Sequence, residues 1–113
     1  TKYSWGDDLD PKLANYRDSG LKKTRTVGSY RPNPWGFFDM HGNVSEWCVD
    51  WYGKYPTSSV IDPIGVASGS LRVRRGGSWY AGGPLLRSAQ RSYHPPGYRG
   101  SGLGFRVGFQ SSK

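Results

Sequence analysis

Few side chains in the sequence could perform nucleophilic, acid–base or metal chemistry. Cys48 is the only cysteine, so the chain can form no internal disulfide. It follows Glu46 and Trp47 among apolar residues, which predicts a buried thiol with a raised pKa, with a reactive thiol as the alternative. The two histidines, His41 and His94, lack the spaced cysteines or carboxylates of a zinc site. We expect His41 to satisfy a hydrogen bond in a turn, and His94 has no assigned chemistry.

The composition predicts a small, loop-rich domain with an aromatic core. The 113 residues suffice for one domain, and chains of this size bury about two-thirds of their unfolded surface. Five Trp, eight Tyr and four Phe must fill much of the core, while 17 Gly and 8 Pro indicate many turns. This combination favours an α+β domain over a helical bundle and argues against a disordered tail.

The net charge of +8 permits attraction to anionic partners, including nucleic acid. The basic residues cluster only at residues 22–25 and 72–75, and no helix-turn-helix, finger or RNA-binding signature is present. We therefore expect no nucleic-acid partner and interpret most of the charge as a solvated face. No apolar run approaches membrane-spanning length, so no membrane association is expected.

Turn residues and alternating apolar positions divide the chain into short elements. The polar, turn-rich residues 1–34 predict an irregular packed leader. Strands are expected from near Glu46, over residues 71–75 and over residues 103–109, whereas residues 85–91 fit a strand or a short helix. The glycines that follow residue 75 predict a bulge or a close backbone approach.

Four segments in register resemble the formylglycine-generating (sulfatase-modifying) enzyme family. Any one of them could occur by chance, but their order and spacing match over nearly the whole chain. They are residues 33–47 (NPWGFFDMHGNVSEW), 72–79 (RVRRGGSW), 86–91 (LRSAQR) and 103–107 (LGFRV). The resemblance implies an α+β, C-type-lectin-like core that is rich in loops, with short antiparallel strands and few short helices. Residues 1–113 would form one partial domain without the family's N-terminal portion, and an extracytoplasmic location is compatible with the family.

The resemblance also implies a structural calcium ion. Asp39, Gly42, Val44 and Glu46 match positions that hold calcium in the family's enzymes, through side-chain oxygens and two backbone carbonyls. Calcium takes six to eight oxygen ligands, which such a turn can supply in part. Alternatively, Asp39 caps the turn and Glu46 pairs with an arginine.

Formylglycine formation in the family depends on two cysteines shortly after the Gly-Gly-Ser segment, where copper binds as thiolate-ligated Cu(I). The matching stretch, residues 79–86 (WYAGGPLL), contains no sulfur. We therefore expect neither copper binding nor this oxidation.

Two functions remain open. The chain could be a non-catalytic, lectin-like module that holds an unidentified ligand or protein through the loop between residues 79 and 102. Its candidate contacts are Tyr80, Tyr93, His94, Tyr98 and Arg99, since aromatic and arginine side chains are enriched at binding hot spots. These side chains could equally cover the core and stay solvated. The alternative is a C-terminal fragment of a sulfatase-modifying or related sulfur-oxidising enzyme, inactive in isolation.

A core without its N-terminal cover should expose strand edges and aromatic surface. We therefore expect self-association as a homodimer, in which domain swapping is one low-cost route. The loops at residues 53–70 and 92–102 could then act as hinges.

Overall fold

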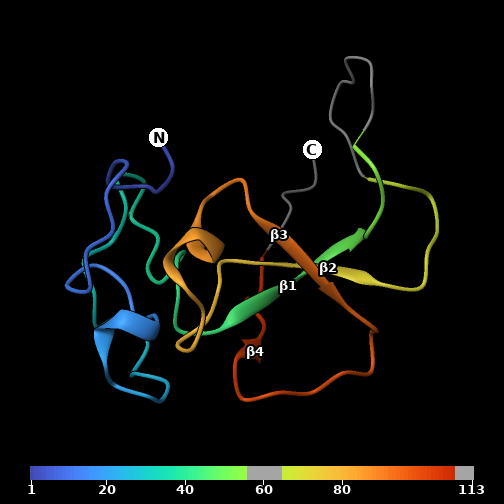
Figure 1. Ribbon diagram of the computed structural model, residues 1–113. Coiled ribbons are helices and arrows are strands. Elements are labelled where there is room, and N and C mark those ends of the chain that lie inside the picture. Colours follow the sequence, from blue (N-terminus) through green and yellow to red (C-terminus); the bar gives the residue numbers. More distant parts are fainter. Residues whose placement is uncertain (56–64, 109–113) are drawn as a thin grey trace.

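Short alternating runs bounded by glycine and proline limit every regular element to a few residues. A computed structural model describes residues 1–55 and 65–108 (Figure 1). Within these ranges the elements are η1 (Arg17–Ser19), β1 (Ser45–Trp51), β2 (Arg72–Arg75), η2 (Gly83–Leu86), β3 (Arg91–His94) and β4 (Leu103–Gly104), where η denotes a 3-10 helix. The first two expected strands are confirmed as β1 and β2. Residues 85–91 contain the end of η2 and the start of β3, and residues 56–64 of the expected long loop lie outside the described residues.

The sheet has the strand order β3-β2-β1-β4 and is mixed. β1 pairs antiparallel with β2, and β2 with β3, but β4 lies parallel to β1. The expected antiparallel arrangement fails at this edge because the long connection after β3 brings the chain back alongside β1 in the same direction. The expected strand over residues 103–109 is also shorter. Beyond Gly104 the chain leaves the ladder, and Arg106 binds Glu46.

The buried apolar residues gather between the leader and the segment after β2. The cluster consists of Tyr3, Ala14, Tyr16, Ala81 and Leu86, with Trp5 packed against it. Backbone hydrogen bonds join the same two segments, from Arg17 N–H to the Ala81 carbonyl (3.0 Å) and from Ser88 N–H to the Lys2 carbonyl (2.8 Å). The predicted packed leader is therefore confirmed, and it forms half of the core.

A network of buried polar side chains holds the leader against the turn that precedes β1. Asn15 and Asn43 are 1% and 7% exposed. Their side chains are 3.3 Å apart, and the Asn43 amide both accepts from Arg25 N–H (2.8 Å) and donates to the Arg25 carbonyl (3.1 Å). Gly42 pairs with Asn15 in an isolated bridge at φ 79°, and a Cβ there would lie 2.4 Å from the Asn15 carbonyl oxygen. Only glycine therefore fits at position 42, where the two segments lie side by side.

The two faces of the sheet carry different side chains. Residues opposite each other on antiparallel strands point to the same face, and neighbours along a strand alternate. Arg72 pairs with His94 and Arg74 with Ser92, so these four residues define what we call the His94 face. Val73, Arg75, Arg91 and Tyr93 define the Tyr93 face.

Tilted aromatic rings and the Arg91 guanidinium cover part of the Tyr93 face. The rings of Tyr52 and Tyr93 lie 4.4 Å apart. The guanidinium of Arg91 lies 4.6 Å from the Tyr52 ring and 3.8 Å from the Tyr55 ring. These contacts account for the position of Tyr93 and direct it away from the His94 face.

His41 links three distant segments. Its Nδ1 lies 2.6 Å from the Leu86 carbonyl oxygen, and its Nε2 accepts a hydrogen bond from Ser4 N–H (3.1 Å). The two backbone partners therefore select the neutral tautomer with the proton on Nδ1. Burial lowers the pKa of His41, and the hydrogen bond to Leu86 opposes this shift. The expected hydrogen bond exists, but it reaches across the fold and does not stay within the turn.

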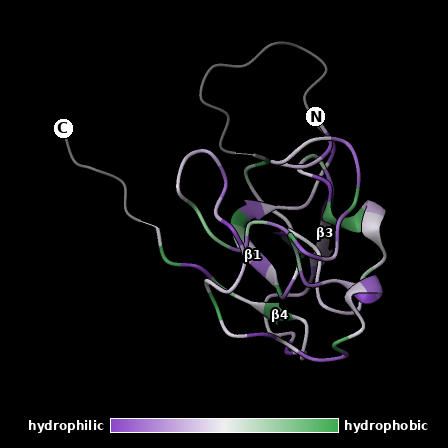
Figure 2. Ribbon diagram, turned by 90° about the vertical axis from the view of Figure 1, so that its left-hand side faces the viewer, coloured by the Kyte–Doolittle hydropathy of each residue, from purple (hydrophilic) through white to green (hydrophobic). Residues whose placement is uncertain are grey.

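Hydrophobic residues occur in short stretches spread over loops and strands (Figure 2). Several of them remain at the surface, and Trp35 is 85% exposed. In the part of the chain that the structure describes, no helix has the length and apolar character of a membrane-crossing segment.

We predict that protonation of His41 destabilises the fold. Because its pKa is lower in the folded state than in the unfolded state, the unfolded state binds the proton first, and stability falls as the pH drops below the ordinary histidine value of about 6.5. The free energy of unfolding from urea titrations should decrease between pH 7 and pH 5, with a slope of at most about 1.4 kcal/mol per pH unit from this group. His41→Gln should remove most of this slope, whereas His94→Gln should remove less of it, because His94, whose pKa is also lowered, is less buried than His41. Equal slopes in both variants would contradict the prediction.

Candidate ligand-binding site

The residues expected to bind ligand divide between the two faces of the sheet. Tyr80 lines a pocket against the His94 face, and the Tyr98 ring stacks on His94 at 3.7 Å and 11°. Arg99 follows in the same exposed loop. Tyr93 lies on the opposite face, because it is adjacent to His94 on β3. The sequence did not reveal this separation, since it left β3 uncertain.

The pocket has a volume of about 170 Å³ and lies where the sheet meets the segment after β2. Ser45, Arg74 and Ser92 contribute from β1, β2 and β3, and Ser78 and Tyr80 from the connecting segment. The turn between them needs glycine: Gly77 has φ 72°, and a Cβ there would lie 2.7 Å from Cδ1 of Leu86. The predicted close backbone approach is thus confirmed.

Arg74 is the charged side chain that the His94 face presents to this pocket. Its Nη1 donates to the Ser45 hydroxyl (3.0 Å), and its Nε is buried with no hydrogen-bond partner among residues 1–55 and 65–108. Our sequence reasoning missed Arg74, Ser45, Ser78 and Ser92. The alternation at residues 72–75 does place Arg72 and Arg74 on one face, but the sequence does not say what that face contacts.

The aromatic ring that lines the pocket is that of Tyr80. Trp79 and Tyr80 meet edge to face at 5.0 Å, and the Trp79 indole donates to the Ser101 carbonyl (3.1 Å). Tyr80 covers Gly102, where a Cβ would lie 2.4 Å from the ring. Burial, and secondarily the charge of Arg74, lowers the pKa of His94. This shift favours the neutral form of the His94 ring.

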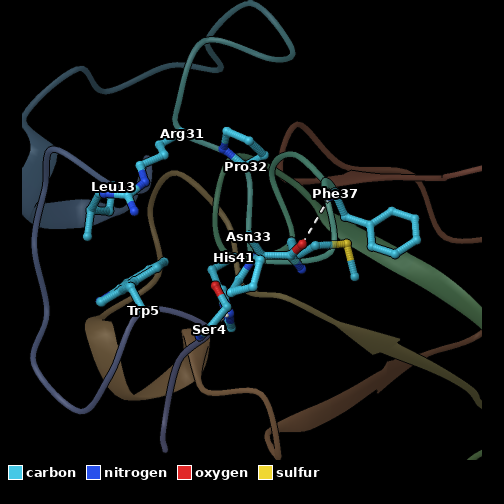
Figure 3. Close-up of a pocket in the computed structure, with 10 residues that line it drawn as sticks. Ser4, Trp5, Leu13, Arg31, Pro32, Asn33, Phe37 and His41 are labelled. Carbon is cyan, nitrogen blue, oxygen red and sulfur yellow. Dashed lines mark hydrogen bonds between the residues drawn. The ribbon is translucent and has the colours of Figure 1, made fainter.

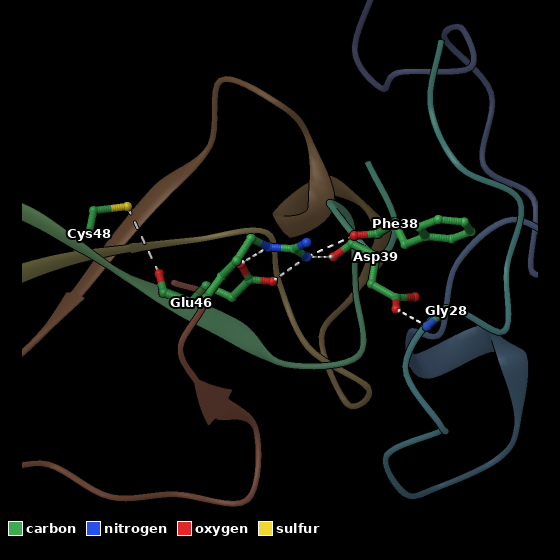
Figure 4. A network of polar contacts seen from close by, with 6 residues as sticks. Gly28, Phe38, Asp39, Glu46 and Cys48 are labelled. Atoms are coloured by element: carbon green, nitrogen blue, oxygen red, sulfur yellow. Dashed lines mark hydrogen bonds and ion pairs between the residues drawn. The ribbon is translucent and has the colours of Figure 1, made fainter. Parts of the chain in front are cut away.

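A second pocket, of about 380 Å³, is lined by all four residues expected to hold calcium. Arg106 joins this pocket to β1: its guanidinium binds Glu46 through Nε–Oε1 (2.7 Å) and Nη2–Oε2 (3.0 Å). Figure 4 shows Glu46, Phe38 and Asp39 in this network of polar contacts. The same guanidinium donates to the carbonyls of Phe38 (2.8 Å) and Asp39 (3.2 Å). The Asp39 carboxylate accepts from Gly28 N–H (2.7 Å), and the hydrogen bond to Glu46 raises the pKa of Arg106.

Comparison with known families decides what this architecture is. Residues 1–110 match the model of the FGE-sulfatase family, described as the sulfatase-modifying factor enzyme 1-like domain. The chain belongs to the FGE-sulfatase family. The family resemblance inferred from the four sequence segments is confirmed.

Curated relatives of this FGE-sulfatase domain carry different names. A serine/threonine-protein kinase pkn1 of Chlamydia pneumoniae is 41% identical over 109 residues, which are 93% of this chain and 17% of the kinase. The formylglycine-generating enzyme of Streptomyces coelicolor is 37% identical over 123 residues, covering 93% of this chain and 39% of the enzyme. The chain therefore spans well under half the length of these relatives.

Solved structures agree with the FGE-sulfatase assignment. Treponema denticola variable protein 1 superposes with a TM-score of 0.78 and 41% identity, over 83% of this chain and 34% of that protein. PvdO from Pseudomonas aeruginosa gives a TM-score of 0.75 and 32% identity, over 88% of this chain and 40% of that protein.

The thiol chemistry of this FGE-sulfatase domain is limited to Cys48. The side chain is half-buried on β1, and burial raises the pKa of its thiol. The direction of the pKa shift agrees with the sequence prediction, but the prediction of a fully buried thiol is wrong. Residues 79–86 contain no thiol, and Ala81 and Leu86 of that segment belong to the buried core.

The Asp39 pocket fits a calcium ion only in part. Its carboxylates and backbone oxygens are hard ligands of the kind calcium prefers, but both oxygens of Glu46 are bound by Arg106. Among the described residues no group of three or more acidic, histidine or cysteine side chains could hold a metal. Calcium at Asp39, Gly42, Val44 and Glu46 therefore stays a prediction that competes with the Glu46–Arg106 pair.

We predict that calcium raises the melting temperature if it binds here. A ligand that binds only the folded state stabilises by mass action, by about 2.7 kcal/mol when free calcium is about a hundred times Kd. Melting with millimolar calcium and with chelator measures the shift. Asp39→Ala should abolish it, and Asp8→Ala, which changes an exposed carboxylate, should preserve it. The absence of a shift, or the same shift in Asp39→Ala, would contradict a calcium site here. Glu46 would then serve only as the ion-pair partner of Arg106.

Proposed function

We propose that this FGE-sulfatase domain is a non-catalytic, lectin-like binding module that holds a ligand or protein on the His94 face. The observation that supports this most is the pocket lined by Arg74 and Tyr80, with Trp79 packed on Tyr80 and with Tyr98 stacked on His94 of the same sheet face. Such rings provide rigid contact area that loses little conformational entropy on binding. Tyrosine and arginine are also frequent hot-spot residues.

The range of relatives supports a binding role over one fixed chemistry. Proteins named as kinases, formylglycine-generating enzymes and a variable protein all contain a segment similar to this chain. A fold shared by such different proteins does not specify a reaction, so the function must be argued from the site. The site described here contains no cysteine.

The second candidate is a fragment of a sulfatase-modifying enzyme that is inactive in isolation. The identity to formylglycine-generating enzymes favours it. The absence of a cysteine pair in the sequence opposes copper-dependent oxidation by this chain, since Cu(I) requires soft thiolate ligands.

We predict that binding depends on one face of the sheet. A displayed peptide and glycan library should yield ligands whose affinity falls about tenfold or more in Tyr80→Ala and Tyr98→Ala, as expected for hot-spot residues. Tyr93→Ala is the matched control, because this tyrosine is similarly exposed but lies on the other face. Biolayer interferometry on the selected ligands measures the three affinities.

Two results would contradict the binding module. One is an equal loss of affinity in Tyr93→Ala, which would show that the His94 face is not the contact surface. The other is an aldehyde product when the purified chain is incubated with a cysteine-containing sulfatase peptide and analysed by mass spectrometry. The aldehyde would favour the enzyme.

We also propose that the chain forms a homodimer. Two adjoining pockets, of about 660 and 520 Å³, share Ser4, Asn33, Pro34, Met40 and His41, and Trp35 lines the second. Figure 3 shows the first of them, with the Phe37 ring directed away from His41. We call the two pockets together the Trp35 groove. Exposed apolar surface of this kind marks interaction sites, and a second copy carries the same surface for a two-fold contact.

The expected assembly is a dimer that dissociates on dilution. Light scattering from high to low micromolar concentration should show a falling mass for the wild type and a monomer throughout for Trp35→Ser. Val49→Ser is the control, because Val49 is 84% exposed and lies on β1 outside the groove. A monodisperse wild-type monomer at high micromolar concentration would refute self-association.

A further inference from the structure

The described residues that line the pocket on the His94 face are rich in hydrogen-bond donors and include no acidic side chain. Its lining residues are Ser45, Arg74, Arg75, Gly76, Gly77, Ser78, Tyr80, Ala81, Gly82, Leu85, Gln90 and Ser92. No aspartate or glutamate is among them. The guanidinium of Arg75 donates to the carbonyls of Ser88 and Gln90 (3.1 and 3.3 Å) and to the Tyr55 hydroxyl (3.4 Å). Because these contacts engage the Arg75 guanidinium, Arg74 is the arginine whose charge is available to a ligand in the pocket.

Most N–H donors of the Arg74 guanidinium find no acceptor among the described residues. A guanidinium has five N–H donors, and the described residues accept one hydrogen bond from it, at the Ser45 hydroxyl. Its Nε is buried without a partner, and the ion pairs of residues 1–55 and 65–108 do not include Arg74. A partly buried cation without a counterion is unfavourable, and an added anion relieves that cost.

The hydroxyls around Arg74 also suit an anion. Ser78 is 1% exposed and lines the pocket. The hydroxyl-bearing residues Ser92 and Tyr80 line the same pocket. Hydroxyl groups can donate to an oxyanion beside a guanidinium, and such charge-assisted bonds are about twice as strong as neutral ones.

From this arrangement we propose that the pocket binds a small oxyanion, a carboxylate or sulfate group presented by the ligand, with Arg74 as its counterion. The proposal rests on the binding role of the His94 face and names the chemistry of the group that it would recognise. The volume of about 170 Å³ is suitable, since an engineered protein cavity of about 150 Å³ holds benzene. An acidic side chain of a protein and an acidic or sulfated sugar both offer this group.

Small probes test the pocket without any knowledge of the natural ligand. Acetate represents the carboxylate source and sulfate the sulfated source, and acetamide is the neutral match for acetate. Amide NMR titrations at constant ionic strength follow Gly77, Ser78 and Ser92. Acetate, sulfate or both should shift these signals saturably in the wild type, and acetamide should not.

Variants on one strand separate a specific site from general attraction to a basic protein. Arg74→Gln should weaken anion binding about tenfold or more, as expected for the loss of a charge-assisted hydrogen bond. Arg72→Gln is the matched control, because Arg72 lies on the same face but outside the pocket, with its guanidinium 3.6 Å from the Trp51 ring. Arg74→Lys keeps the charge, and its amide spectrum shows whether the fold tolerates a change at this position.

The outcomes distinguish this inference from the proposed function. Equal shifts with acetamide, or equal weakening in Arg72→Gln and Arg74→Gln, would overturn the oxyanion site. Library ligands that still require Tyr80 and Tyr98 would then leave the binding module intact. Saturable anion binding that depends on Arg74, together with library ligands that ignore the His94 face, would support the pocket and overturn the proposed function.

Discussion

The buried amide pair of Asn15 and Asn43 is the constraint on which the rest of the structure depends. Polar groups removed from water must find partners, and these two side chains find theirs in segments far apart in sequence. The Asn15 amide also donates to the Lys23 carbonyl (2.9 Å), and the Asn43 carbonyl accepts from Trp79 N–H (2.8 Å). The leader, the turn before β1 and the segment after β2 are thereby held in one arrangement, although the domain has little regular structure.

The candidate pocket follows from that arrangement. Once Trp79 is fixed by Asn43, the chain from Gly77 to Tyr80 must pass over the His94 face, where Arg74 lies half-buried. The same segment then enters the core through Ala81 and Leu86. The stretch that resembles the catalytic part of formylglycine-generating enzymes therefore serves here for packing and for the wall of a pocket. A fold can be retained in a chain whose matching segment lacks the cysteines for one particular reaction.

Charge distribution distinguishes the two proposed sites. Arg106 neutralises Glu46 and binds two carbonyls, so the pocket at Asp39 already contains a cationic side chain. Arg74 has no such acidic partner among the described residues. One arginine is thus paired with a carboxylate inside the fold, and another faces a pocket. The net charge of +8 makes an anionic ligand electrostatically favourable at long range.

The sequence by itself determined the family, the first two strands and the irregular leader, because these depend on local spacing and on four motifs in register. It also indicated a thiol with a raised pKa at Cys48. It did not determine that β4 runs parallel to β1 or that Tyr93 and His94 face opposite ways, because strand register and neighbours are set by contacts between distant residues. The sequence likewise did not indicate that Arg74 faces a pocket without an acidic partner among the described residues. Whether an arginine has an ion-pair or hydrogen-bond partner depends on which acceptors the folded chain places beside it.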